Sequence, residues 1–216
     1  MRSSRGREIE IKLHVPDLRA MQRTLQRLDA KVHSRVFESN TLYDTSHSVL
    51  QTSGRVVRLR VETPVTKHAV PSRVSASKAG ANRPTRGTLT YKAPIAEDGR
   101  SSGGDRYKER EEIEVKVLNI GDLARIFQGL GMRIGFRYEK FRTKYTLKKI
   151  PGLELDLDET PAGIFLELEG PRRSIDRAAR LLGYAPSDYD CRSYWGLHQE
   201  YCQRRGISAP HMIFGI

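Results

Sequence analysis

Three short segments of this 216-residue chain, residues 8–12, 112–116 and 167–169, alternate carboxylates with aliphatic side chains. Successive side chains of a β-strand point to opposite faces, so each segment would gather its carboxylates on one face. Basic residues alternate in the same way at residues 58–60, 90–92 and 140–144. If these strands share one sheet, acids and bases meet on one face. The acids could hold a metal ion there, and the bases a polyanion.

The acidic set is large and consists of carboxylates alone. Hard divalent cations such as Mg²⁺ and Mn²⁺ prefer carboxylate oxygens, and Mg²⁺ commonly shares its coordination shell with substrate phosphates. The six histidines are scattered along the chain, which argues against a zinc site. One Glu-x-Glu pair is usually a solvated strand face, but three such pairs with opposing bases favour a metal site. The candidate ligands are Glu8, Glu10, Glu112, Glu114, Asp156, Asp158, Glu167 and Glu169.

The basic set suits a chain of phosphates. Guanidinium groups match phosphate oxygens with two parallel hydrogen bonds, and lysine supplies a point charge. Ion pairing with the acids across the sheet is the other interpretation. The two are compatible, because acids and bases that share an interior would pair with each other until a ligand binds. The candidate bases are Lys12, Arg58, Arg60, Lys92, Arg110, Arg137, Lys140, Arg142 and Lys144.

Composition narrows the class of protein. The net charge of +12 predicts an anionic partner, and the hydrophobic fraction of 38% suits an interior that is partly polar. Nucleic-acid binding would need stacking aromatics among outward bases, whereas Tyr91, Phe141 and Phe165 fall opposite the charges of their strands. This disfavours a nucleic-acid partner. No apolar run reaches the roughly 20 residues that span a bilayer, and the basic N-terminus precedes no apolar stretch. A cytoplasmic protein without a membrane partner is therefore expected.

The hydrophobic pattern predicts a chain of strands interrupted by single helices. Strands are expected at residues 7–14, 32–43, 55–62, 88–93, 107–117, 134–148, 153–157 and 164–170. Helices are expected at residues 16–29, 119–130, 174–182 and 187–206, with a short helical piece within 44–54. Residues 63–87 lack periodicity and predict a mobile basic loop. Most strands are joined by turns or single helices. This favours an α+β fold, a mostly antiparallel closed barrel with flanking helices, with residues 1–216 as one domain.

The opening Glu-x-Glu-x-Lys of residues 8–12 resembles the signature of the CYTH or triphosphate tunnel metalloenzyme family. That family includes class IV adenylate cyclases, thiamine triphosphatases and inorganic triphosphatases. Further similarity follows in order at residues 57–60, 90–92, 110–114, 140–142, 157–159, 165–169 and 193–194. The resemblance implies an eight-stranded antiparallel tunnel with a charged interior. The insertion after Glu62 departs from the compact members of the family.

The resemblance also implies roles for individual residues. Glu8, Glu10, Glu167 and Glu169 would hold the metal, Glu112 or Glu114 would assist, and Asp156 or Asp158 would occupy the acidic position before the last strand. Lys12, Arg58, Arg60, Lys92, Lys140 and Arg142 would bind the triphosphate, with Arg110 and Arg137 as further candidates. Glu8, Glu10, Glu114 and Lys12 are the expected catalytic residues.

The expected activity is Mg²⁺- or Mn²⁺-dependent hydrolysis of a triphosphate, namely inorganic tripolyphosphate, thiamine triphosphate or a nucleoside triphosphate. Hydrolysis is favoured because it asks for the fewest specific contacts. A class IV adenylate cyclase, which would convert ATP to cyclic AMP and pyrophosphate, is the first alternative. A non-catalytic polyphosphate- or nucleotide-binding module is the second. One fold can host all of them, so the fold does not decide the reaction. Whether the protein forms a homodimer stays open.

Overall fold

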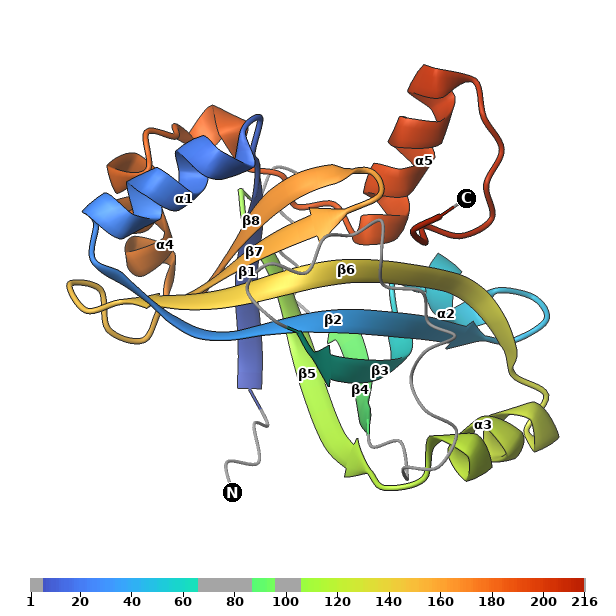
Figure 1. The fold of residues 1–216 in the computed structure, drawn as a ribbon. Helices are drawn as coiled ribbons and strands as arrows, with labels where there is room; N and C mark the ends of the chain where they lie inside the picture. The colour runs from blue at the N-terminus through green and yellow to red at the C-terminus, as the bar shows by residue number, and fades with distance from the viewer. Residues whose placement is uncertain (1–5, 66–86, 96–105, 216) are drawn as a thin grey trace.

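The computed structural model describes residues 6–65, 87–95 and 106–215, and these form a closed antiparallel β-barrel with helices on its outside (Figure 1). Around the barrel the strand order is β1-β5-β4-β3-β2-β6-β7-β8. This confirms the predicted fold class. The strands are β1 (Gly6–His14), β2 (Ala30–Asp44), β3 (Val56–Pro64), β4 (Gly87–Pro94), β5 (Lys108–Val117), β6 (Arg133–Leu147), β7 (Glu154–Thr160) and β8 (Gly163–Glu169).

The helices begin where local capping chemistry allows. They are α1 (Leu18–Arg27), α2 (Val49–Thr52), α3 (Ile120–Gly129), α4 (Arg172–Leu181) and α5 (Tyr194–Arg205), with a 3₁₀ turn at Pro186–Asp188. The Asp17 carboxylate accepts a hydrogen bond from the Ala20 amide and caps α1, and the Asn119 side chain caps α3 by accepting from the Asp122 amide.

Two predicted helix starts were wrong. Helix α4 begins at Arg172, directly after Pro171, and not at Ser174. The last helix begins at Tyr194 and is capped by Ser193, because the residues after Ser187 form only a 3₁₀ turn and an extended stretch. That helix ends as predicted at Gly206, whose φ of 62° is the left-handed conformation typical of a helix C-cap.

The register explains why acids and bases share the interior. Strand β1 pairs with β5 on one side, where Glu8 lies opposite Arg110, and with β8 on the other, where Lys12 lies opposite Glu167. Directly opposed residues point to the same face of a sheet. Arg142 of β6 likewise lies opposite Asp158 of β7. Charges of opposite sign therefore line one face around the barrel.

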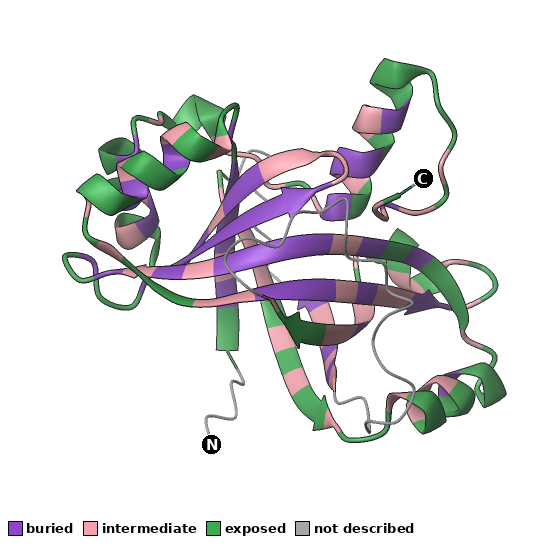
Figure 2. Ribbon diagram, viewed as in Figure 1, coloured by how far each residue is buried: buried purple, intermediate pink, exposed green. Residues whose placement is uncertain are grey.

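The aliphatic partners of these charged residues form the core on the outer face. Leucines of β7 and β8 pack with Ile11 and Leu13 of β1 beneath α1 and α4, and this region is buried (Figure 2). Met21 and Leu25 of α1 and Ile175 of α4 belong to the same cluster. A second cluster includes Phe136, Tyr138 and Tyr194 and extends onto α5. The aliphatic core thus lies between the barrel wall and the helices, whereas Phe136, Tyr138 and Tyr194 of the second cluster lie beside charged residues in the barrel interior.

The remaining expectations concern the cysteines, the loop and the membrane. The helix predicted at residues 187–206 would have held both cysteines, but only Cys202 lies in α5, and Cys191 precedes that helix. The predicted loop falls largely on residues 66–86, outside the described residues, while 63–64 and 87 belong to strands. None of the helices in the described ranges combines the length and apolar character needed to cross a bilayer.

Candidate active site

A cavity of about 600 Å³ occupies the barrel interior. Acidic and basic side chains from β1, β3, β4, β5, β6, β7 and β8 line it. Most of the residues singled out from the sequence meet there, although they come from segments far apart in the chain. They are Glu8, Glu10, Lys12, Arg58, Arg60, Lys92, Arg110, Glu112, Glu114, Lys140, Arg142, Lys144, Asp156, Glu167 and Glu169.

Arg137 is the exception among the predicted bases, and its assignment to the site was wrong. It alternates out of phase with Tyr138, Lys140 and Arg142 on β6, so it is exposed and lies on the outer face. Its backbone amide donates to the His211 ring, and Met212 forms a bridge with Tyr138, so the C-terminal segment lies along the edge of β6.

Asp158 also stands apart from the cavity lining, because it is fully buried behind the bases. Its carboxylate accepts hydrogen bonds from Lys140 Nζ at 2.9 Å, Arg142 Nε at 2.7 Å and Tyr194 Oη at 2.6 Å. Both oxygens are thus engaged in holding other side chains. The geometry makes Asp158 a support for the bases, whereas Asp156 is the carboxylate of this pair that reaches the cavity.

Arg142 is the most heavily paired base of the interior. Its guanidinium contacts Asp156 at 2.7 Å and Asp158 at 2.5 Å, and it also contacts Glu167. Burial opposes the charged form of Arg142, but Asp156 and Asp158 outweigh burial and raise its pKa well above the ordinary value. Arg142 is therefore a permanent cation held in one orientation, the property that a phosphate-binding guanidinium needs.

Tyr194, at the start of α5, lies beneath two lysines. Its ring centroid is 5.3 Å from Lys12 Nζ and 4.6 Å from Lys140 Nζ, so the aromatic face supports both ammonium groups. Burial raises the pKa of Tyr194, and its hydroxyl remains a donor to Asp158. Tyr194, in the first turn of α5, thus helps to fix Lys12 and Lys140 in the barrel interior.

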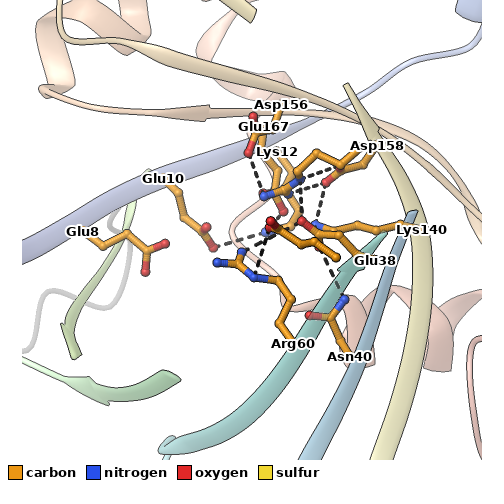
Figure 3. Close-up of polar contacts among 12 residues, drawn as sticks. Glu8, Glu10, Lys12, Glu38, Asn40, Arg60, Lys140, Asp156, Asp158 and Glu167 are labelled. Carbon is orange, nitrogen blue, oxygen red and sulfur yellow. Dashed lines mark hydrogen bonds and ion pairs between the residues drawn. The ribbon is translucent and has the colours of Figure 1, made fainter. Parts of the chain in front are cut away.

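Carboxylates from β1, β5 and β8 crowd together elsewhere in the cavity. Lys92 Nζ lies 2.6 Å from Glu8 and 3.4 Å from Glu112, and Lys12 Nζ lies 3.2 Å from Glu10 (Figure 3 shows Glu8, Glu10 and Lys12). Burial, followed by the neighbouring Glu8 carboxylate, raises the pKa of Glu169 to about 8. Although Glu169 is an exposed residue at the end of β8, its acidic neighbours therefore favour its neutral form near pH 7.

This donor set fits a hard divalent cation by its chemistry, because it offers carboxylate oxygens and crowds carboxyl groups whose mutual repulsion a cation would relieve. Its arrangement is not preformed. Over the described residues, no three His, Cys, Asp or Glu side chains already stand together as a metal site. The reason is visible in the ion pairs, since Glu8 and Glu10 are held by Lys92, Lys12 and Lys108.

Lys108, Glu154, Glu38 and Asn40 are among the interior residues that the sequence prediction missed. Lys108 and Glu154 line the cavity, and both lie two positions before a predicted residue, Arg110 and Asp156 respectively. Extending the strand alternation by one step would have found them. Glu38 and Asn40 of β2 are fully buried and polar. Their segment carries no repeated acid–aliphatic pattern, so the signal that identified the other strands was absent.

The comparisons with known proteins agree with this geometry. A solved structure of a Pyrococcus horikoshii protein superimposes with a TM-score of 0.67 at 20% identity, covering 89% of this chain and 98% of that one. A Vibrio parahaemolyticus protein described as a candidate adenylate cyclase gives a TM-score of 0.64 at 16% identity, covering 89% and 97%. A Hippeastrum candidate adenylyl cyclase gives 0.55 at 20% identity, covering 94% and 98%.

These likenesses show a shared fold. No curated protein sequence matches the chain. The family model described as "CYTH domain" matches residues 6–194, which include all eight strands of the barrel and the first residue of α5. The chain therefore belongs to the CYTH domain family.

Proposed function

We propose that this protein hydrolyses a triphosphate with the help of Mg²⁺ or Mn²⁺ bound in the barrel interior. CYTH proteins are typically enzymes of the triphosphatase or cyclase kind, and the family depends on a metal in general. The observation that carries the proposal is the pairing of two sets in one cavity, a series of bases and a crowd of carboxylates. The bases suit a phosphate chain, and the carboxylates suit a cation that travels with phosphates.

The bases would orient the phosphate chain. These bases, Arg58, Arg60, Lys92, Lys140 and Arg142, come from three strands and face one space, so they can contact successive phosphoryl groups. Phosphoryl transfer depends mainly on positioning and on stabilising charge that develops on the phosphate oxygens. When the triphosphate binds, its oxygens would replace carboxylates such as Glu112 and Glu114 as partners of these bases.

The carboxylates would serve the metal and the attacking water. Glu8, Glu10, Glu167 and Glu169, assisted by Glu112, carry the oxygens that would hold the cation. When bound, the cation would draw off charge from the phosphate oxygens. A carboxylate among Glu8, Glu10 and Glu114 would orient the water in line with the terminal phosphorus. Glu114 accepts from Thr90 Oγ1 at 2.8 Å, which fixes the direction of its carboxylate. Lys12 would steady Glu10 and Glu167, which lie 3.2 and 3.3 Å away.

Hydrolysis is proposed ahead of cyclisation because it requires only the phosphate chain and a water to be placed. Cyclisation would also require a ribose hydroxyl to be held against the α-phosphorus. The Hippeastrum neighbour, which is 20% identical to this chain, is described as showing a dominant triphosphatase activity. That description supports hydrolysis over cyclisation. Adenylate cyclase remains the alternative activity for the same cavity.

Product analysis tests the proposal. The purified protein would be incubated with Mg²⁺ or Mn²⁺ and, separately, with tripolyphosphate, thiamine triphosphate and ATP, and orthophosphate, pyrophosphate and cyclic AMP would be measured. We expect orthophosphate without cyclic AMP, and only when a metal is present. Cyclic AMP with an equal amount of pyrophosphate from ATP would make the protein a cyclase. Absence of every product with either metal would support a binding module.

Replacing Arg60 with alanine is expected to raise KM for the triphosphate. Arg60 is nearly buried, and its guanidinium lies 3.3 Å from Glu114, so it faces the proposed phosphate path. Loss of one charged hydrogen bond costs roughly 1.5–3 kcal/mol, which corresponds to about a 10- to 150-fold fall in kcat/KM. Steady-state kinetics would measure it. Arg137→Ala is the matched control, since this arginine lies on the outer face. Equal kinetics for Arg60→Ala and wild type would remove Arg60 from the site.

A further inference from the structure

Strand β2 places a carboxylate, Glu38, among the phosphate-facing bases of the barrel. Its side chain is wholly inaccessible to solvent. Glu38 lies opposite Lys140 in the register of β2 with β6, and Asn40 lies opposite Arg60 in the register of β2 with β3. Figure 3 shows Glu38 between Lys140 and Arg60, with Asn40 beside it.

Glu38 acts on these bases through its charge and not through close pairing. Lys140 Nζ lies 3.6 Å away, Arg142 Nε 3.8 Å and Arg60 Nη1 3.9 Å, all beyond ordinary hydrogen-bond length. Each base has a nearer carboxylate elsewhere, such as Asp158 at 2.9 Å from Lys140. The Asn40 amide donates to Glu38 Oε2 at 3.4 Å, whereas the buried Oε1 makes no hydrogen bond to the described residues.

The charge on Glu38 is nevertheless secure. Burial opposes ionisation of this carboxyl, but Lys140, Arg142 and Arg60 outweigh burial and hold its pKa well below the usual range. Glu38 also differs from the carboxylates that a phosphate chain would displace. The side chains of Glu112 and Glu114 are 16% and 28% exposed at the cavity, whereas that of Glu38 is 0% exposed. Glu38 therefore stays beside the bases when their other partners change.

We propose that Glu38 is a positioning residue that serves as the resident counter-anion of the phosphate-binding bases and limits how tightly they retain phosphate. The inference rests on the proposed function. Without Glu38, Arg60, Lys140 and Arg142 would present a larger uncompensated positive charge to any phosphate in the cavity. The diphosphate left after hydrolysis would then bind too tightly to leave quickly. With Glu38, the same bases hold the triphosphate in place and release the shorter product.

The test measures the binding of inorganic pyrophosphate to the full chain by titration calorimetry, without metal. Glu38→Gln keeps the shape and removes the charge, and we expect at least about tenfold tighter binding, because a unit charge a few ångströms away interacts strongly inside a protein. Asn40→Asp adds a negative charge at the neighbouring position, so binding should weaken by a similar factor. The double variant Glu38→Gln/Asn40→Asp keeps the wild-type net charge and should return the dissociation constant close to the wild-type value.

The opposite signs separate a charge effect from a loss of structure. Damage to the barrel would weaken binding in both single variants, whereas the proposal requires one to tighten and the other to weaken. In steady-state assays, Glu38→Gln should lower KM and kcat together and should be inhibited by pyrophosphate at lower concentrations than wild type.

Unchanged or weaker pyrophosphate binding by a folded Glu38→Gln protein would overturn the inference. If that variant does not fold, unchanged or tighter binding by Asn40→Asp would overturn it instead. Failure of the proposed function would be seen separately, as a wild-type protein that binds pyrophosphate with these charge effects but turns over no triphosphate.

Discussion

Replacing Glu10 with glutamine should abolish metal-dependent turnover while leaving the barrel folded. Glu10 is almost fully buried and contacts Lys12 at 3.2 Å and Lys108. Burial opposes its ionisation, but Lys108 and Lys12 outweigh burial and hold its pKa well below the usual range, which favours the carboxylate anion. Glutamine keeps the shape and removes the charge that a divalent cation needs. We expect kcat/KM to fall more than about 100-fold, since even residues that only support a metal ligand cost 10- to 100-fold.

Steady-state assays over a range of Mg²⁺ and Mn²⁺ concentrations would measure this loss, and circular dichroism would verify the fold. Glu111→Gln is the matched control, because Glu111 lies on β5 one position out of phase with Glu112 and is exposed on the outer face. It should behave like wild type. A Glu10→Gln protein with full activity at ordinary metal concentrations would contradict the assignment of Glu10 to the metal.

Arg142→Met should cause the largest loss of stability among the interior variants. Arg142 touches Asp156, Asp158 and Glu167, and methionine would leave these buried carboxylates without their shared cation. Breaking a buried ion pair by removing one partner costs about 3–5 kcal/mol. Urea unfolding, followed by circular dichroism at pH 8, would measure the change in the free energy of unfolding. Arg137→Met on the outer face should stay within about 0.5 kcal/mol of wild type.

The deficit of Arg142→Met should shrink as the pH falls. Burial raises the pKa of Asp156 to about 6 even with Arg142 present. Because the folded-state pKa lies above the unfolded value, the folded protein takes up more protons between pH 4 and 6, and lowering the pH through that range favours the fold. Without Arg142, a proton can neutralise Asp156 in place of the lost guanidinium. The same urea experiment at pH 5 should therefore show a smaller difference from wild type, and an equal difference at both pH values would contradict this account.

Strand alternation predicted the barrel because it reports directly on the two faces of each strand. In Glu8-Ile9-Glu10-Ile11-Lys12 the acids and lysine face the cavity and Ile11 joins the outer core. The same reasoning placed Glu112 and Glu114 in the cavity. The side chains of a strand alternate with a period of two residues. The face of each residue can therefore be predicted from its immediate neighbours in the sequence alone.

The misses arose where the local pattern does not define a face. Strand β6 carries charged residues in both phases of its alternation, with Arg137 and Glu139 in one phase and Lys140 and Arg142 in the other. Spacing alone therefore could not exclude Arg137 from the site. Glu38 lies on β2 beside Phe37 and Ser39, in a segment of mixed character. Its place among the bases depends on the pairing of β2 with β3 and β6, which only the three-dimensional structure provides. The start of α5 was missed because Ser187 and Ser193 are equally good capping residues by type.

The strand order has a consequence for how the chain folds. Strand β1 is the first strand of the barrel to be synthesised, yet its partners are β5 and β8, and Lys12 pairs with Glu167 of the last strand. Contacts between residues so distant in sequence are slow to form, because the chain loses the entropy of the closed loop before the contact stabilises it. Until β8 is made, Lys12 lacks its Glu167 partner, and the sheet keeps two open edges at β1 and β7. The barrel therefore cannot close until β8 has been synthesised.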